Sequence, residues 1–427
     1  DLNMAFLIGG ANSAADTAFS VDNSCRFNDD DSAYMAKTPG SAGNRRKFTI
    51  SFWVKRGSMG AAHKNIFSSG TYGSTQLTQI FFESDDKLHI SDYTSGQSLS
   101  WKLETNRVFR DPSAWYSIII AVDTEQGTAA NRVKMYINGT QETSFATETY
   151  PAENFDCAMN LDHVHTVGNR NGASLYFDGY IAEFVLIDGT QYAATSFGEF
   201  NSDSPTIWQP IDVSGLTFGT NGFYLDFEAS GTLGNDANGG TDLTATNLTA
   251  TDQCQDSPTN NFCTMNPLDN LSNDATFSQG NTVTYTDGGS EYSFNTSTFY
   301  PSKGKWYFEV KVVAGNNSGN SYVIGISDDV SGATSEELGN ESTQWSYYGL
   351  GHIRTSNGNT ATSDYNTYTD GDIVGVYLDL DNSKLYFSKN GTLENSTGVS
   401  ITAPASVAGG GYFLASGYFD GDASSNA

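Results

Sequence analysis

The residues best suited to binding chemistry lie in STQWSYYGLGHIRTSNGNTATSDYNTY (342–368), a segment rich in aromatic rings and hydrogen-bond donors. Aromatic rings stack on sugar faces or anchor protein contacts, and polar groups beside them orient a ligand. We therefore predict a binding surface made by Trp345, Tyr347, Tyr348, His352, Arg354 and Tyr365. Trp101 is a further candidate platform for a sugar ring. The alternative for each ring is that it packs inward.

Residues that could catalyse hydrolysis are harder to find. A retaining glycosidase needs two carboxylates roughly 5 Å apart, and residues of one strand share a face only at even spacing. Glu183 and Asp188 are five positions apart, so they fall on opposite faces. His163 and His165 share a face, but a metal site needs a third ligand that the sequence does not place. The sequence contains neither a Gly-x-Ser-x-Gly elbow nor a phosphate loop, although a Ser-His-Asp triad stays open. We therefore predict that the chain is not an enzyme.

The charge of the chain excludes two classes of partner. Its 427 residues carry a formal net charge of −28, which repels nucleic acid and anionic lipid. No apolar run reaches the roughly 18 residues that span a membrane, so we predict no membrane insertion. The four cysteines include no CxxC pair, which makes a zinc site a poor prediction. Whether Cys254 and Cys263 form a disulfide stays open.

Period-two alternation dominates the chain. It places apolar residues on one face of FTISFWVK (48–55), WYSIIIAVD (115–123), GKWYFEVKV (304–312) and DIVGVYLDL (372–380). Such alternation is typical of antiparallel sheets with one buried face, and frequent Asn-Gly and Asp-Gly turns are typical of sandwiches. Because the chain is too long for one typical core, we predict an all-β protein of two antiparallel β-sandwiches.

One short pattern occurs twice. KMYINGTQE (134–142) and KLYFSKNGTLE (384–394) share a Lys, a Tyr between apolar residues, Asn-Gly-Thr and a Glu. Asn-Gly is the strongest short hairpin signal, because both turn positions favour positive φ. We predict the same hairpin in each sandwich. Coincidence is the alternative, since Asn-Gly is common in this chain.

The texture changes between the two sets of strands. Residues 231–268 are small, polar and rich in Gly, Asn and Thr. We predict a connector there, between a domain at 1–230 and a domain at 269–427. Leu243, Leu248, Phe262 and Met265 could still pin the connector to a domain.

Longer stretches resemble two known families. FTISFWVKRG, WYSIIIAVDT, RVKMYINGTQE and HTVGNRNGASLYFDGYIAEFVLIDG, in this order, resemble the laminin-G-like, concanavalin-A-like jelly roll over about residues 20–230. GKWYFEVKV, SYVIGISDD, GLGHIRT and GDIVGVYLDLDNSKLYFSKNG resemble the SPRY domain over about residues 275–420. SPRY domains usually finish with a further strand, which this sequence lacks. We expect that this strand is missing or that a longer polypeptide has been cut.

The resemblances imply where ligands bind. Laminin-G-like domains often hold calcium at the rim of the sandwich, and Ca²⁺ takes six to eight oxygen ligands. Oxygen-rich loops occur at NDDDS (28–32), ESDD (83–86) and LDLDN (378–382). We predict Asp85 and Asp86 as calcium ligands. SPRY-like domains usually recognise partners through their loops, which agrees with the aromatic segment above.

The tandem of the two domains resembles tail-fibre or appendage proteins of bacteriophages. That resemblance implies a virion or extracellular protein that recognises a cell-surface glycan or protein without catalysis. It also implies assembly with other fibre subunits and a homo-oligomer. The alternatives are a structural subunit without its own receptor site, a bacterial extracellular adhesin and a polysaccharide-degrading enzyme.

Overall fold

The computed structural model describes residues 19–60, 62–172, 175–270, 275–286, 293–313, 322–330, 337–355, 359–362 and 365–418. These residues fall into two compact units that meet in sequence at Phe262 and Cys263, with Ser278–Gly280 belonging to the larger, N-terminal unit. Each unit is an antiparallel β-sandwich, which confirms the predicted fold class.

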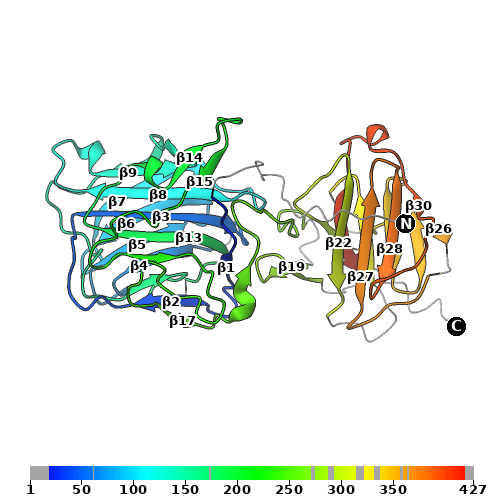
Figure 1. The fold of residues 1–427 in the computed structure, drawn as a ribbon, viewed down its shortest axis with the longest axis horizontal. Helices are drawn as coiled ribbons and strands as arrows, with labels where there is room; N and C mark the ends of the chain where they lie inside the picture. The colour runs from blue at the N-terminus through cyan, green and yellow to red at the C-terminus, as the bar shows by residue number, and fades with distance from the viewer. Residues whose placement is uncertain are drawn as a thin grey trace. The chain divides into compact units, whose positions relative to one another are not determined.

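The larger unit contains two eight-stranded sheets (Figure 1). The first sheet runs β10 (Thr140–Gln141), β9 (Val133–Ile137), β8 (Tyr116–Asp123), β3 (Lys47–Arg56), β13 (Gly179–Asp188), β1 (Ser24–Phe27) and β18 (Gln253–Cys254), and β16 (Phe223–Leu225) also pairs with β13. The second sheet runs β11 (Phe145–Thr149), β7 (Leu99–Val108), β6 (Lys87–Tyr93), β5 (Leu77–Phe82), β4 (Lys64–Ser69), β12 (His165–Val167), β2 (Tyr34–Lys37) and β17 (Thr244–Thr246). A separate hairpin pairs β14 (Gly198–Phe200) with β15 (Trp208–Pro210).

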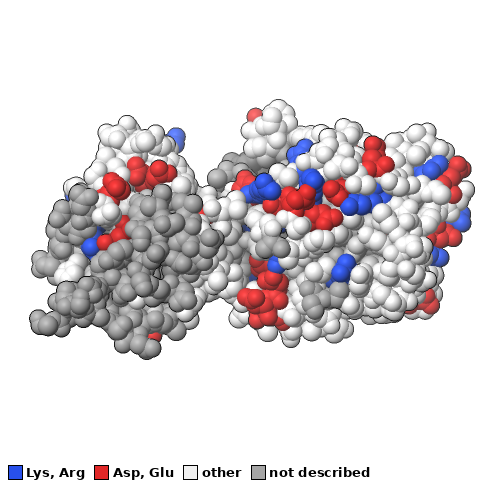
Figure 2. Space-filling model, turned by 180° about the vertical axis from the view of Figure 1, so that it is seen from behind, with Lys and Arg blue, Asp and Glu red and all other residues white. Residues whose placement is uncertain are grey.

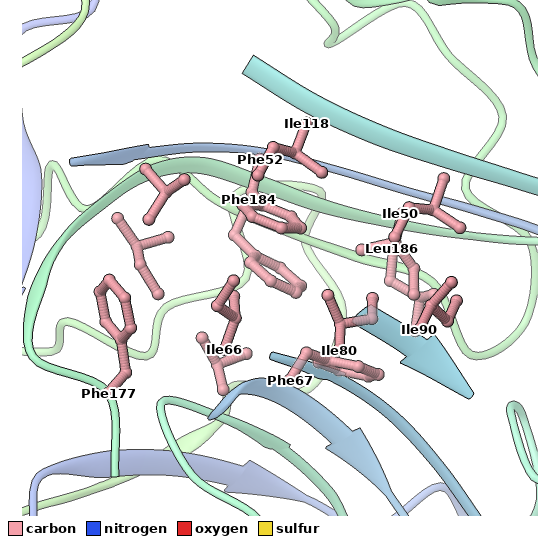
Figure 3. Packing of buried hydrophobic residues seen from close by; sticks show 14 of the residues in the cluster. Ile50, Phe52, Ile66, Phe67, Ile80, Ile90, Ile118, Phe177, Phe184 and Leu186 are labelled. Atoms are coloured by element: carbon pink, nitrogen blue, oxygen red, sulfur yellow. The ribbon is translucent and has the colours of Figure 1, made fainter. Parts of the chain in front are cut away.

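The core of the larger unit lies between its two sheets. Phe52 of β3 stacks on Phe184 of β13 with ring centroids 5.6 Å apart, and Phe67 of β4 lies 5.5 Å from Phe184 across the sandwich. Figure 3 shows Ile50, Ile118 and Leu186 projecting from the first sheet toward Ile66, Ile80 and Ile90 of the second. The apolar residues of the alternating pattern therefore face the core, as predicted.

The opposite face of the first sheet differs from the prediction of one buried face. Thr49, Ser51, Trp53 and Lys55 of β3 are all buried, although the alternation places them on the polar side. Apolar residues between 192 and 218 pack over this face and form a second cluster with Trp53. The alternation in β3 shows only which face of the strand is more apolar. It cannot show that the other face is also buried, because the covering residues come from a distant segment without strand periodicity.

Residues 231–262 are part of the larger unit and do not form a free connector. β17 extends the second sheet, β18 extends the first, and Leu233 and Leu243 are buried in the core. The prediction failed because strands of two or three residues carry no readable alternation. The sequence boundary between the units lies near the end of the predicted connector.

The smaller unit has a six-stranded and a five-stranded sheet. The first runs β21 (Ser293–Thr296), β31 (Phe413–Tyr418), β23 (Tyr322–Ser327), β24 (Gln344–Tyr348), β25 (His352–Thr355) and β26 (Asn359–Thr362). The second runs β22 (Lys305–Lys311), β27 (Ile373–Asp379), β28 (Lys384–Lys389) and β29 (Thr392–Leu393), with β30 (Val399–Ser400) also on β28. A further pair joins β19 (Ala275–Ser278) and β20 (Val283–Thr286).

Helical structure in the described residues is confined to short 3-10 turns at Ala129–Asn131, Ala194–Ser196, Ala250–Asp252 and Pro404–Ser406. Within that part of the chain, no helix has the length and hydropathy needed to cross a membrane. Cys254 and Cys263 are not joined by a disulfide. The expected loss of a C-terminal strand concerns residues after Tyr418, which lie outside the described residues.

Candidate functional site

A groove at one end of the larger sandwich has a volume of about 670 Å³. The loops after β4 and after β6 contribute to it, as does the segment before β12. In an antiparallel sheet these two loops lie at the same end. The lining residues are Arg45, Ser74, Thr75, Gln76, Thr94, Ser95, Phe155, Asp156, Leu161 and His163.

Buried hydrogen bonds hold the groove's polar floor in place. Arg45 donates from Nε to the carbonyl of Cys157 at 2.7 Å and from Nη2 to Oε1 of Gln76 at 2.7 Å. Gln76 donates in turn to Oδ1 of Asp92 at 3.0 Å. Asp92 is fully buried, and burial raises the pKa of its carboxyl. Nη1 of Arg45 makes no hydrogen bond to the described residues, so the guanidinium is fixed with one donor group left for a ligand.

One wall of the groove carries a histidine with a spare nitrogen. Nδ1 of His163 is buried without a hydrogen-bond partner among the described residues, while its carbonyl accepts a bond from Nδ1 of His165 at 2.8 Å. The backbone N–H of Asn160 donates to Nε2 of His165, which fixes the tautomer with hydrogen on Nδ1. Burial lowers the pKa of His165 to about 4, so this ring is a neutral support.

The groove suits a polyhydroxylated ligand. Four hydroxyl groups, an amide, a guanidinium and an imidazole can donate or accept hydrogen bonds, and Phe155 and Leu161 supply apolar surface. A Ser-His-Asp triad needs a hydrogen bond between nucleophile and base, and the ring of His163 makes none within the described structure. The arrangement can therefore bind and orient a ligand.

Two family models match the chain. Residues 29–194 match the concanavalin A-like lectin/glucanases superfamily, through its Laminin_G_3 model, and residues 305–410 match the SPRY domain. These matches confirm the predicted tandem of the two domains. No curated protein is similar enough in sequence to count as a relative.

Solved structures share parts of the fold. A Bacteroides ovatus protein described as carbohydrate-binding is 14% identical, with a TM-score of 0.35, over 53% of this chain and 58% of that one, which is less than two thirds of its length. A heptameric SAP-like pentraxin from Limulus polyphemus is 13% identical with a TM-score of 0.29, over 41% of this chain and 80% of that one. The SPRY domain of human HERC1 is 15% identical with a TM-score of 0.26, over 32% of this chain and 79% of that one.

The aromatic rings predicted to form a binding surface lie in the core of the smaller unit. Trp345, Tyr347, Tyr348 and Tyr365 expose between 0 and 7% of their surface. Tyr347 packs edge-on against Tyr365 and Phe387, with ring centroids 5.4 Å away in both cases. The prediction of a stacking platform was wrong for these rings, because β24 lies inside a sheet and is buried on both faces, and Tyr365 packs against Tyr347 of that strand.

The other two members of that predicted surface are partly buried on β25. Arg354 forms an ion pair with Glu337, and its guanidinium carbon lies 5.5 Å from the centre of the Tyr348 ring. Nδ1 of His352 is buried and makes no hydrogen bond to the described residues. The two side chains are neighbours of a packed aromatic core, and the structure does not gather the predicted set into a cavity.

Trp101 is fully buried between the sheets of the larger unit. Trp101 and Leu103 are two positions apart on β7, so their side chains lie on the same face of the strand and both point into the core. The prediction of a sugar platform was therefore wrong for this ring, and the alternative of inward packing holds.

Asp85 and Asp86 do not fit a calcium ion, because lysine and arginine side chains already neutralise them. Oδ1 of Asp86 accepts bonds from Arg56 at 2.9 Å and from the N–H of Gly60 at 2.9 Å, and its Oδ2 accepts one from Arg110 at 2.7 Å. Burial alone would raise the pKa of Asp86, but these partners lower it. Asp85 pairs with Lys87 at 2.5 Å.

The loop at 28–32 fits a cation better. Asn28 follows β1 and Asp178 precedes β13, so both lie at the same end of the β1–β13 ladder, where Phe27 pairs with Gly179. Each is 4% exposed, and each has an Oδ1 atom that is buried without a hydrogen-bond partner in the described structure. Burial and the charge of Asp29 raise the pKa of Asp178 to about 7. Asp29 is already paired with Nζ of Lys64, so the oxygens left for a cation are the two orphaned Oδ1 atoms of Asn28 and Asp178.

A carboxylate pair does occur on the second sheet. Ligand atoms of Glu83, His89 and Glu104 lie within 4.8 Å of one another. Nζ of Lys102 lies 3.7 Å from Glu83 and 2.5 Å from Glu104, so it supplies the positive charge that a metal would bring. Burial alone would raise the pKa of Glu83, but the hydrogen bond with His89 and the nearby side chains of His63 and Lys102 lower it. A general acid needs a raised pKa, so Glu83 does not suit that role.

Figure 2 shows the same mixing of charge on a wider scale, since Lys and Arg side chains of the larger unit, on the right, alternate with Asp and Glu along its upper edge. Glu183 and Asp188 also have separate partners, Tyr224 and Asn44 respectively. The carboxylates of Glu83, Glu104, Glu183 and Asp188 therefore each serve an ion pair or a hydrogen bond.

Sequence reasoning missed the groove because its residues come from loops without a motif. Ser74, Thr75, Thr94 and Ser95 are ordinary turn residues. The available signal was topological: counting antiparallel strands from β4 to β7 places both loops at one end of the sheet. The contribution of 155–163 could not be counted in this way, because that segment has no regular strand before His165.

Proposed function

We propose that this chain recognises a cell-surface glycan without catalysing a reaction on it, as a module of a virion fibre or appendage. The observation that carries the proposal is the end groove, in which fixed polar groups surround the apolar side chains of Phe155 and Leu161. The lectin-superfamily match of the same unit supports a glycan over a protein ligand. The fibre setting rests on the resemblance of the tandem to phage appendages, and it implies a homo-oligomer with other fibre subunits as partners.

Binding to a panel of bacterial surface polysaccharides and to whole cells tests the proposal, with reducing ends assayed in parallel. Ser74→Trp combined with Ser95→Trp fills the groove mouth from two exposed positions. We expect saturable binding that falls at least tenfold in this variant, which corresponds to about 1.4 kcal/mol. Thr128→Trp is the matched control, because Thr128 lies on another loop and its side chain makes no capping bond.

The remaining outcomes separate the alternatives. If the groove variant binds as well as the original chain, the groove is not the binding site. If the chain binds no surface at all, it is a structural subunit without its own receptor site. Release of reducing ends would show an enzyme. A monomeric mass in solution would favour an adhesin over a fibre, because fibres are closed homo-oligomers.

We also propose that calcium binds at the 28–32 loop, held by Asn28, Asp178 and the neighbouring acidic side chains. A ligand that binds only the folded state raises stability by about 2.7 kcal/mol at one hundred times its Kd. We expect added Ca²⁺ to raise the melting temperature of the larger unit, and Asp178→Asn to abolish that rise. Asp85→Asn is the control and should keep it. An equal rise in both variants would place the ion elsewhere.

A further inference from the structure

Lys55 of β3 is buried together with two polar side chains from the segment after β18. Nζ of Lys55 donates to Oδ2 of Asp256 at 2.8 Å and to Oδ1 of Asn261 at 2.9 Å. Its third bond goes to the carbonyl of Phe262 at 2.7 Å. Lys55, Asp256 and Asn261 are 1%, 6% and 4% exposed. The other described lysines that pair with a carboxylate expose between 12% and 63% of their side chains, so Lys55 differs from them in its exclusion from water.

The carboxylate of Asp256 is oriented as a base for this lysine. Its Oδ1 accepts hydrogen bonds from Nε1 of Trp115 at 2.9 Å and from the backbone N–H of Phe262 at 3.2 Å. Oδ2 is therefore the oxygen that faces Nζ of Lys55. A lysine amine becomes a nucleophile when a neighbouring group removes its proton in a site that excludes water, and a base held in place by a third group is the usual arrangement.

The side-chain amide of Asn261 is the electrophile within reach of that amine. Because a C=O bond is about 1.23 Å long, Cγ of Asn261 lies within roughly 4 Å of Nζ of Lys55. Nδ2 of Asn261 donates to the carbonyl of Ser113 at 2.7 Å, which fixes the plane of the amide. Well-oriented groups held at near-contact distance react with effective molarities of about 10⁵–10⁸ M, so an exchange between an amine and an amide, which is slow in water, becomes feasible here.

We infer that Lys55 and Asn261 form a covalent amide bond between their side chains, an isopeptide bond, with Asp256 as the catalytic base and acid. Asp256 first takes one proton from the Lys55 ammonium, and rotation about the Cε–Nζ bond turns the free electron pair of Nζ toward Cγ of Asn261. Nζ attacks Cγ, the Cγ–Nδ2 bond breaks, and its electron pair leaves with Nδ2. The two protons that Nζ loses pass through Asp256 to the departing nitrogen. The products are one amide N–H, the Asp256 carboxylate and an ammonium ion.

The bond joins the inner strand β3 to the last residues of the larger unit. The two units meet in sequence at Phe262 and Cys263, directly after Asn261. Tension along the chain at that point passes through the cross-link to β3 and does not peel β18 from β1. The cross-link therefore suits a protein that is pulled, and it does not depend on the glycan that the end groove is proposed to bind.

Mass spectrometry of the denatured full chain tests the inference. We expect the intact mass to be lower than the mass of the sequence by one ammonia molecule, and the proteolytic fragments that contain Lys55 and Asn261 to appear as one branched species. The fragments are needed because succinimide formation at Asn138 or Asn390 also releases ammonia. The full sequence mass after prolonged incubation of the folded protein, or a mass loss without the branched fragment, would overturn the inference and leave an ordinary buried ion pair. Loss of one water molecule, with Lys55 joined to Asp256, would also overturn it.

Variants separate the chemistry from the fold. Asp256→Asn keeps the size of the side chain but cannot take the proton, and Lys55→Arg keeps the charge without the amine. Both should have the full sequence mass, whereas Asn261→Asp should form the same bond with loss of water in place of ammonia. Asn260→Ala is the matched control and should keep the branched fragment, because the Asn260 side chain makes one long bond, to the carbonyl of Gln255 at 3.4 Å. A branched fragment in Asp256→Asn would overturn the role of Asp256, and the fragments of the original chain decide the inference even if a variant fails to fold.

Discussion

The two Asn-Gly hairpins show how far a local sequence determines local structure. Asn138 and Asn390 have φ angles of 47° and 50°, and the following glycines have 74° and 79°. In each hairpin the Asn side chain accepts a bond from the strand before, from Ser117 N at 2.8 Å or Ile373 N at 2.9 Å. The backbone N–H of each Asn returns a bond to the same residue. The repeated sequence therefore forms the same hairpin in both units, as predicted.

The surroundings of the two hairpins differ completely. Gly139 lies against the ring of Trp208, whereas no atom lies within 4 Å of a Cβ built on Gly391. The first turn is covered by the β14–β15 hairpin, and its Asn138 lines the same cavity as Trp208, whereas the second is an open surface turn. The motif therefore sets the turn geometry, while an inserted segment with no motif decides whether the turn is covered.

Replacing each turn glycine with alanine should give the largest difference in stability between the two hairpins. Each substitution places a Cβ at positive φ, which costs about 1 kcal/mol. Gly139→Ala also overpacks Trp208, which adds about 2 kcal/mol. By calorimetry of the full chain, we expect the transition of the larger unit to fall by roughly 6–12 °C for Gly139→Ala, and that of the smaller unit by roughly 2–4 °C for Gly391→Ala.

A double variant sharpens this contrast. In a Trp208→Ala background, Gly139→Ala should cost only about 1 kcal/mol, because the ring that it meets has gone. Equal costs for Gly139→Ala in both backgrounds would mean that the ring moves aside, so the close approach of Gly139 would not fix Trp208 in place.

The same comparison explains what could be predicted from sequence. The hairpins, the all-β class and the core faces of β3 and β8 follow from periods of two and from Asn-Gly, which are local signals. Trp345 and Tyr347 were misplaced because an aromatic residue on a strand buried on both faces has the same sequence signature as one on a binding surface. Trp208 was not singled out, because its neighbours in that cavity come from Asn138 and Pro258, which the fold alone brings together.

Buried acidic side chains should make the stability of the larger unit depend on pH. Burial raises the pKa of Glu183 to about 8, although its bond to Tyr224 opposes the shift. The folded larger unit then keeps a proton that the unfolded chain releases above about pH 4.5. Its stability is greatest below that pH and falls as pH rises toward 8, by up to about 1.4 kcal/mol per pH unit.

Urea unfolding at pH 5, 6.5 and 8 measures this slope. Glu183→Gln should recover roughly 3–4 kcal/mol at pH 8 relative to pH 5. A smaller slope should remain up to about pH 7, from Asp178. Glu153→Gln is the control, because that side chain is exposed. If the control removed as much of the slope as Glu183→Gln, the slope would belong to the general surface charge.

Alanine at the two asparagines should make the hairpins look alike again. Asn138→Ala and Asn390→Ala each lose the bond from the preceding strand and place a residue other than Asn or Gly at positive φ, and Asn390→Ala also loses an exposed bond from its Nδ2 to Oδ1 of Asp372. We expect each to cost about 1 kcal/mol in its own unit, equal within about 0.5 kcal/mol. Asn→Gly at the same positions should cost less, because glycine accepts the backbone conformation. Unequal costs by urea unfolding would contradict the equivalence of the two turns.

The glutamates that follow the two turns should give the smallest and most specific difference. Glu142 accepts backbone bonds from Thr143 and Ser144 and pairs with Arg107 at 3.0 Å, whereas Glu394 accepts bonds from the backbone and side-chain amides of Asn366. Glu142→Gln therefore loses an ion pair and Glu394→Gln does not, so we expect costs of about 0.5 kcal/mol and less than about 0.3 kcal/mol. High salt screens an exposed ion pair but not a neutral amide contact, and half of the Arg107 side chain is exposed. The cost of Glu142→Gln should thus shrink in 1 M NaCl while that of Glu394→Gln stays constant, and an equal response to salt would show that the shared Glu has the same role in both hairpins.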